Sequence, residues 1–205
     1  MSPEVYLTFI AASVLLFLTP GPAMSLIVAN SASFGSRAGL VTVGGNTVGL
    51  GVLLGAVIAG LSYVLLLMAD YFDWIRWIGA LYLIWLGVNR IRASNSPIAG
   101  VQAGTKKADR RFFWQGLAVG LSNPKVLLFY GAFFPQFVDF SHNVGHQLTV
   151  LAVTFLVLAL AVDGGMALAA SQAGKWLASR KARLIDRIGG TLLIAGGLWL
   201  AFARR

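Results

Sequence analysis

The stretch "LTPGPAMSLIVAN", residues Leu18–Asn30, lies inside the first long apolar run of the chain and decides how that run can fold. A proline in a helix interior removes a backbone hydrogen bond and costs about 3 kcal/mol, and a glycine adds roughly another 1 kcal/mol. Pro20, Gly21 and Pro22 therefore predict a helix that is broken near its middle. Because such a break is costly, we expect it to do more than bend the chain.

The composition is that of an integral membrane protein. Of the 205 residues, 58% are hydrophobic and only 11% are charged, whereas a soluble domain is about 25% charged. The runs Val5–Ser36 and Ala38–Ala69 carry no charged side chain, and about 20 apolar residues are enough for a helix to cross a bilayer. Cysteine is absent, which excludes disulfides and thiolate metal sites. The sequence indicates no metal, no cofactor and no enzymatic motif such as GxSxG or HExxH.

Six apolar segments follow one another, and we predict one all-α transmembrane domain over residues 1–205. The polar stretches between them are predicted to be loops, among them residues 93–111 and Lys175–Arg187. The predicted spans are approximately Val5–Asn30, Gly39–Met68, Trp74–Ile91, Phe112–Val138, Gln147–Ala173 and Ile188–Ala203.

The basic residues are concentrated in the loops that follow the first, third and fifth spans. Twelve of the 16 lysines and arginines lie there, and cytoplasmic loops of membrane proteins carry an excess of these residues. We therefore place these loops in the cytoplasm and both termini outside. The same rule accounts for the net charge of +9 without a nucleic-acid partner. The twelve are Arg37, Arg90, Arg92, Lys106, Lys107, Arg110, Arg111, Lys175, Arg180, Lys181, Arg183 and Arg187.

The fourth span contains a second break, in "LSNPKVLLF" (Leu121–Phe129). Pro124 interrupts the helix there, and Lys125 places at membrane depth a charge that costs at least about 2.5–3.5 kcal/mol. Since each half of the chain has three spans, the second half enters the membrane in the opposite sense to the first. We predict two inverted three-helix repeats, at about residues 1–92 and 112–205, with broken first and fourth helices, an arrangement typical of secondary transporters.

The two breaks predict a binding site near the bilayer midplane. The helix segments that begin near Pro22 and Pro124 present free N–H groups and a positive dipole end, and Lys125 adds a full charge, so a substrate carboxylate fits there. In the fifth span Asp163 is flanked by apolar residues, and such a buried acid either pairs with a cation or takes up a proton. Its partner is Lys125, a substrate ammonium or a transported proton, and Asn46 can add a hydrogen bond to the substrate.

Each of these residues also has a purely structural interpretation. The prolines can be simple kinks whose freed backbone groups find neighbours. Lys125 and Asp163 can form a structural ion pair, and Asn46 can hydrogen-bond between helices. Glycines with small-xxx-small spacing predict close helix packing, within one subunit or in a homodimer. These pairs are Gly45/Gly49, Gly51/Gly55 and Gly116/Gly120.

Four longer segments carry a recognisable pattern. They are "LTPGPAMSLIVANSASFGSRAGL" from Leu18, "WIRWIGALYLIWLGVNRIR" from Trp74, "FFWQGLAVGLSNPKVLLFYGAFFPQFV" from Phe112 and "RIGGTLLIAGGLWLAF" from Arg187. With these segments the chain resembles the LysE/RhtB family of bacterial amino-acid exporters over nearly its whole length. The resemblance implies that Pro-Gly-Pro at residues 20–22 and Asn-Pro-Lys at residues 123–125 are the family motifs, and that Asp163 stands where many relatives have an acid.

The resemblance implies secondary active export of amino acids or close derivatives, driven by protons, across the cytoplasmic (inner) membrane of a bacterium. The motifs do not separate basic from neutral substrates. Two alternatives remain open, namely a transporter of another small solute or cation, and a membrane scaffold that transports nothing. The predicted substrate-binding residues are Pro20, Gly21, Pro22, Asn46, Asn123, Pro124, Lys125 and Asp163, with Asp163 also as the proton-coupling group.

Overall fold

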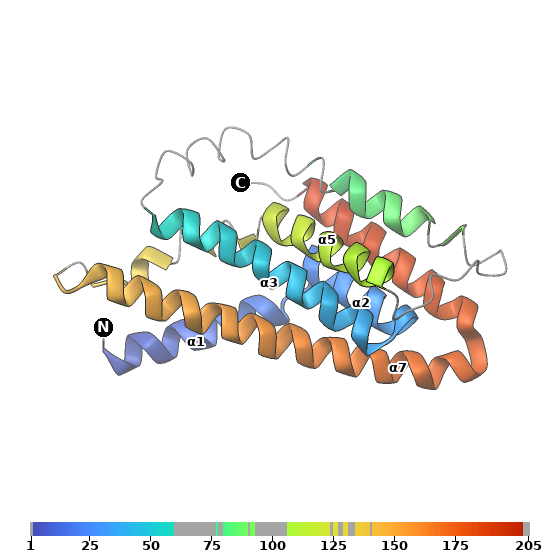
Figure 1. Ribbon diagram of the computed structural model, residues 1–205, viewed down its shortest axis with the longest axis horizontal. Coiled ribbons are helices and arrows are strands. Elements are labelled where there is room, and N and C mark those ends of the chain that lie inside the picture. The colour runs from blue at the N-terminus through green and yellow to red at the C-terminus, as the bar shows by residue number, and fades with distance from the viewer. Residues whose placement is uncertain are drawn as a thin grey trace.

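In the computed structural model, every regular element of the described residues is a helix (Figure 1). The described residues are 2–59, 77, 80–89, 91–92, 106–123, 125–126, 129–130, 134–139 and 141–202. The helices are α1 (Pro3–Leu18), α2 (Pro22–Phe34), α3 (Ser36–Ile58), α5 (Lys106–Ser122), η2 (Phe134–Phe137), α7 (Val144–Phe202) and a further helix at Ala80–Asn89. The all-α prediction is confirmed, whereas the arrangement as two inverted three-helix repeats stays a prediction.

The first break lies where the sequence predicts it. α1 ends at Leu18 and α2 begins at Pro22, and the two helices are bent by 58° relative to each other. Pro22 takes the first position of α2, where the missing N–H of a proline is not needed. Gly21 precedes it and gives the helix no side-chain cap. The predicted broken first helix is therefore confirmed.

The second break is also present, but the chain beyond it differs from the prediction. α5 ends at Ser122, Asn123 has no regular structure, and helical backbone resumes at Lys125, while Pro124 lies outside the described residues. The predicted fourth span extends to Val138, but it does not continue as a regular α-helix, because the described backbone changes to a π turn and then to the 3-10 helix η2. Pro135 within η2 lacks the N–H that a continuing α-helix requires.

The predicted loop at Lys175–Arg187 is wrong, because α7 keeps helical backbone throughout this segment. The segment contains neither glycine nor proline and is rich in Ala, Leu, Arg and Lys, which favour helix. The ribbon of α7 nevertheless doubles back, so that its beginning and its end form two arms (Figure 1). The predicted loop at residues 93–111 is too long at its end, since α5 already begins at Lys106.

Two helical stretches in the described part of the chain are long and apolar enough to cross a membrane, Ser36–Ala56 in α3 and Val144–Gly174 in α7. The bent pair α1 and α2 makes a third candidate span. Ala80–Asn89 and Arg187–Gly196 are shorter apolar helices. The far end of the predicted second span and the beginning of the third lie outside the described residues.

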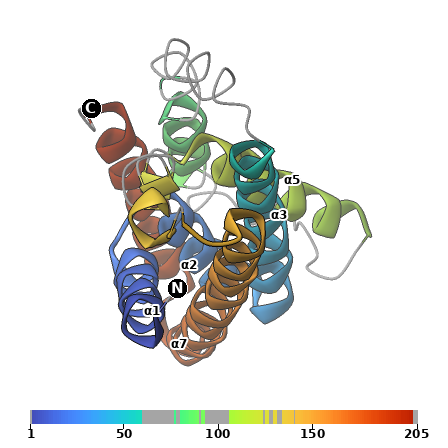
Figure 2. The ribbon, with the colours of Figure 1, turned by 90° about the vertical axis from the view of Figure 1, so that its left-hand side faces the viewer.

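The helices pack as a bundle around α2. α3 packs against α5, and α2 packs against α7 and α3. In Figure 2, which looks along the bundle, α2 lies among α1, α3 and α7. This arrangement brings residues of the first and second halves of the chain side by side in the interior.

Four glycines let α3 and α5 approach each other closely. A Cβ on Gly49 would lie 2.9 Å from the carbonyl oxygen of Leu117, and one on Gly120 would lie 2.6 Å from that of Asn46. Gly45 and Gly116 are still closer to the opposite backbone. The predicted close packing is confirmed for Gly45/Gly49 and Gly116/Gly120, which act within one subunit, whereas Gly51 makes only ordinary contacts with Leu156. Around Gly55 there is open space, so a homodimer stays a prediction.

Buried aromatic side chains fill the bundle between the centre and one end, and we call them the aromatic cluster. The ring of Phe9 lies 5.7 Å from that of Phe134 and 5.2 Å from that of Phe137. The cluster joins α1, the segment after the second break, η2 and the first arm of α7. Its members are Phe9, Phe17, Phe129, Tyr130, Phe134, Phe137 and Phe155.

Replacing Gly45 by alanine is expected to lower the free energy of unfolding by about 1–3 kcal/mol, because the new methyl group must displace the backbone of α5 at Phe113. Gly44→Ala is the matched control, since nothing lies within 4 Å of a Cβ at that position. Thermal unfolding of both purified variants in detergent checks this. Equal stability of Gly45→Ala and Gly44→Ala would contradict the close contact.

Candidate functional site

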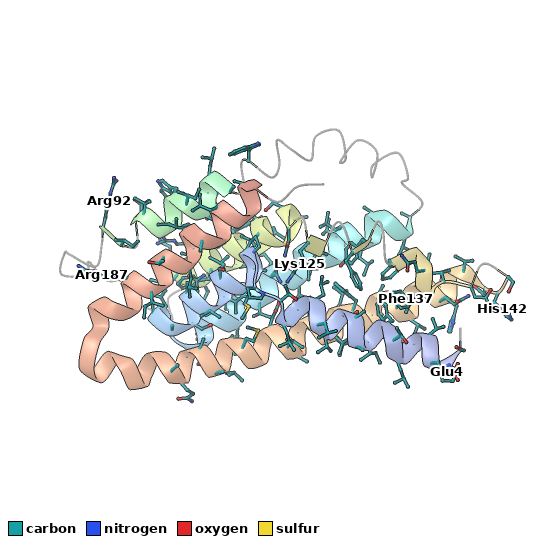
Figure 3. All side chains as sticks on the ribbon, turned by 180° about the vertical axis from the view of Figure 1, so that it is seen from behind. Glu4, Arg92, Lys125, Phe137, His142 and Arg187 are labelled. Atoms are coloured by element: carbon teal, nitrogen blue, oxygen red, sulfur yellow. The ribbon has the colours of Figure 1, made fainter. Side chains whose placement is uncertain are left out.

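The two predicted breaks meet at Lys125. In Figure 3 this residue lies between one end of the molecule, marked by Glu4 and His142, and the opposite end, marked by Arg92 and Arg187. Arg92 and Arg187, two of the basic residues that we place in the cytoplasm, therefore lie at the end away from Glu4. Lys125 sits between the two, at the depth of the breaks.

The ammonium of Lys125 is held by the end of α1. Its Nζ donates hydrogen bonds to the carbonyl oxygens of Leu16, at 2.6 Å, and Thr19, at 2.7 Å. In an unbroken helix the Leu16 carbonyl would accept from the N–H four residues later, which is Pro20 and has none. Lys125 thus supplies, from the second half of the chain, a donor that the first break removes. A positive charge at a helix C-terminus is also favoured by the helix dipole.

Asn123 shapes the second break from within. Its side-chain Oδ1 accepts a hydrogen bond from the backbone N–H of Lys125 at 3.2 Å, and its carbonyl accepts from Val126. An asparagine that accepts in this way starts the next helical segment. Asn123 is therefore a positioning residue for Lys125, and its amide is buried in the bundle.

Asp163 and Asn46 bond directly to each other, a contact that was not predicted from the sequence. Asn46 Nδ2 donates a hydrogen bond to Asp163 Oδ2 at 3.1 Å, and only 2% and 3% of these residues is exposed. Asn46 lies on α3 and Asp163 on the first arm of α7. The other amide atom, Asn46 Oδ1, is buried and has no hydrogen-bond partner in the described part of the chain. The pair therefore offers one carboxylate and one amide oxygen that has no hydrogen-bond partner among the described residues.

Lys125 and Asp163 do not form a direct ion pair among the described residues. The interpretation of these residues as a closed structural ion pair is therefore not what the structure shows. We call Lys125, Asn46 and Asp163 the centre. Here the cation of Lys125 binds backbone carbonyls, and the acid Asp163 binds the amide of Asn46.

The tripeptide Pro20–Pro22 contributes the break itself. Pro22 is buried, and α2 begins there with its first N–H groups lacking a side-chain cap. The second arm of α7 closes over this end, since a Cβ on Gly196 would meet Ser25 Oγ at 3.0 Å. Whether this helix end or Pro124 receives a substrate carboxylate stays a prediction.

A second buried polar group was not predicted from the sequence, and we call it the inner polar cluster. Asn30 Nδ2 donates to Thr42 Oγ1 at 3.0 Å and to Gln115 Oε1 at 3.1 Å. All three residues are buried, on α2, α3 and α5. Thr42 and Asn46 are four residues apart on one face of α3, a spacing that could have revealed a polar face.

An ion pair closes the basic end of the same helices. Arg37, at the beginning of α3, donates to Asp109, at the beginning of α5, with a distance of 2.7 Å between Nη2 and Oδ2. The contact places the starts of α3 and α5 at one end of the molecule, as the basic loops predicted.

Replacing Thr42 by valine is expected to lower the free energy of unfolding by about 0.6–1.7 kcal/mol, because Asn30 loses a buried acceptor. Thr149→Val is the matched control, since both hydroxyls donate to the carbonyl four residues earlier at 2.8 Å but Thr149 is exposed. Thermal unfolding in detergent compares them. A loss of the same size in both variants would contradict a role of the inner polar cluster in stability.

The fold and the centre define a helical membrane protein whose broken helices enclose a buried charged site. The LysE type translocator family matches residues 14–204. Because this match covers nearly the whole chain, the chain belongs to the LysE family of translocators. The resemblance that the Pro-Gly-Pro and Asn-Pro-Lys motifs suggested is thereby confirmed.

Several relatives match from end to end. A homoserine/homoserine lactone efflux protein of Salmonella typhimurium is 31% identical over 205 residues, which cover 100% of this chain and 99% of the relative. A leucine efflux protein of Klebsiella pneumoniae subsp. pneumoniae is 27% identical over 201 residues, 98% of this chain and 93% of the relative. An uncharacterized membrane protein of Vibrio cholerae is 28% identical over the full length of both. No solved structure matches the chain.

Proposed function

We propose that the chain is a secondary active exporter of amino acids or close derivatives, driven by protons, in the inner membrane of a bacterium. Two observations support the proposal. Relatives at about the same length are named efflux proteins for homoserine, homoserine lactone and leucine. The buried centre carries one fixed cation and one fixed acid, which complement the carboxylate and the ammonium of an amino acid.

The observation that carries the proposal is the pair Asp163 and Asn46. An ammonium has three donors and no acceptor, and this pair offers it the Asp163 carboxylate and the unused Asn46 Oδ1. A neutral ligand with acceptors alone would leave that carboxylate without a counter-charge. We therefore assign the substrate ammonium to Asp163 and Asn46.

The substrate carboxylate is assigned to Lys125 and the beginning of α2. Among the described residues, Lys125 uses two of its three N–H donors, on Leu16 and Thr19, and we assign the third to a ligand. The uncapped N–H groups of α2 and its dipole favour the same charge. Both groups lie at the first break, across the bundle from Asp163.

Coupling to protons follows from the chemistry of Asp163. A proton that reaches this carboxylate from outside removes its charge, weakens its hold on the ammonium and favours release. An inward-moving proton supplies about 2.3 kcal/mol per 100 mV. A tenfold solute gradient costs about 1.4 kcal/mol, so one proton is sufficient to sustain it.

The packing indicates which part of the bundle moves. α3 and α5 interlock through glycines, and the inner polar cluster and the ion pair of Arg37 with Asp109 join them further. Because of these contacts we expect α3 and α5 to move together, although they belong to different predicted repeats. Toward the end that carries Glu4, the centre is closed by the aromatic cluster, and we expect release to require its opening.

Asp163→Asn tests the assignment. We expect efflux of the transported amino acid to fall about ten- to a hundredfold, because an ammonium bound to a neutral amide loses about 1.5–3 kcal/mol. The remaining efflux should no longer depend on the pH gradient. Cells loaded with dipeptides report each amino acid that appears in the medium, with the amount of protein in the membrane measured in parallel.

Asp139→Asn is the matched control for this change. Asp139 lies near the turn before α7, and hydrogen bonds from Ser141 lower its pKa to about 2, so it keeps its charge over the whole range of the assay. We expect this variant to export like the unchanged protein. Export by Asp163→Asn at the normal rate and with the normal pH dependence would refute the coupling role. Loss of efflux in both variants would show that the effect is not specific to the centre.

A further inference from the structure

The carbonyl oxygens at the end of α1 form a cation site that is already occupied by part of the protein. Leu16 and Thr19 direct their oxygens at one ammonium, the Nζ of Lys125, at 2.6 and 2.7 Å. Thr19 has extended backbone, with φ −70° and ψ 127°, which turns its carbonyl out of the helix direction. Two carbonyls thus converge on one point beside the break.

The sequence that follows α1 removes the usual helical donor of the Leu16 carbonyl. The N–H that would reach Leu16 in an unbroken helix belongs to Pro20, which has none. Thr19 donates its own N–H to Leu15 at 3.0 Å and more weakly to Leu16 at 3.2 Å. At membrane depth an unsatisfied carbonyl is costly, and the end of a helix carries partial negative charge. The two carbonyls and the negative end of the helix dipole therefore favour a cationic donor.

We propose that the carbonyl oxygens of Leu16 and Thr19 form a binding site for a primary ammonium, which Lys125 fills in this conformation and a free ammonium fills when Lys125 leaves. The two short contacts require N–H donors that diverge from one nitrogen, which a primary ammonium provides and a quaternary one does not. Lys125 is then a tethered ligand that joins the two breaks.

The site is a second position for an ammonium, at the end of α1 and separate from Asp163 on α7. When Lys125 turns to a carboxylate ligand, the carbonyls that it leaves can take the ammonium of the same or the next molecule. This use of the site in transport rests on the proposed function. The binding of an ammonium to the carbonyls does not, because it depends only on the contacts at Lys125.

Lys125→Ala with n-propylammonium chloride tests the site. The alanine keeps Cβ, and n-propylammonium restores the missing methylenes and the ammonium. We expect a saturable rise in the thermal unfolding midpoint of the purified variant, about 3–6 °C at ten times the dissociation constant. The unchanged protein should not respond, because Lys125 fills the site. Tetramethylammonium, with the same charge and no N–H, should have no effect.

Lys107→Ala is the matched control, since it removes an exposed lysine at the beginning of α5. No shift with n-propylammonium, an equal shift in Lys107→Ala, or an equal shift with tetramethylammonium or sodium would overturn the proposal. If Lys125→Ala does not accumulate, Lys125→Met keeps the apolar stem and is tested with methylammonium under the same criteria. None of these measurements involves transport, so a failure here and a failure of the export assay are separate results.

Discussion

The ammonium of Lys125 bound to the carbonyl oxygens of Leu16 and Thr19 is the contact on which the centre of this protein depends. A helix that breaks inside a membrane leaves carbonyl groups that lipid cannot satisfy. Prolines at positions 20 and 22 create this situation, and a lysine from the other half of the chain relieves it. The contact therefore lowers the free-energy cost of both breaks. It satisfies the carbonyl groups at the first break, and it gives a partner to the charge of Lys125 at the second, which would be unfavourable at this depth without one.

The surrounding helices hold this contact in place and give it a partner of opposite charge. α3 carries Asn46 against Asp163, and the glycines of α3 and α5 bring the two backbones together at the same level. The centre is bordered by the glycines of α3 and α5 and by the large rings of the aromatic cluster, so its two sides differ. A buried acid, a half-buried cation and an unused amide oxygen within such a frame support the proposed export of an amino acid.

Much of this could be predicted from the sequence, because prolines and intramembrane charges are local signals. The two breaks, the all-α class and the family follow from residues that stand out against apolar surroundings. The bond between Asn46 and Asp163 was not predicted, although each residue was singled out as a candidate for binding the substrate. The bond from Lys125 to main-chain carbonyls could not be predicted, since backbone acceptors leave no mark in the sequence. The helical backbone of α7 at residues 175–187 was missed because its charges resemble a loop, although its residues favour helix.

The central claim is tested most directly by solid-state NMR of the protein in bilayers. With side-chain ¹⁵N-labelled lysine and carbonyl-¹³C-labelled threonine, dipolar dephasing reports whether a lysine nitrogen lies next to a threonine carbonyl. The other lysines, at positions 106, 107, 175 and 181, lie in basic segments, and Lys125→Met identifies the signal that belongs to residue 125. The account predicts strong dephasing of this signal by Thr19. A Lys125 nitrogen that shows none would mean that the two breaks do not meet.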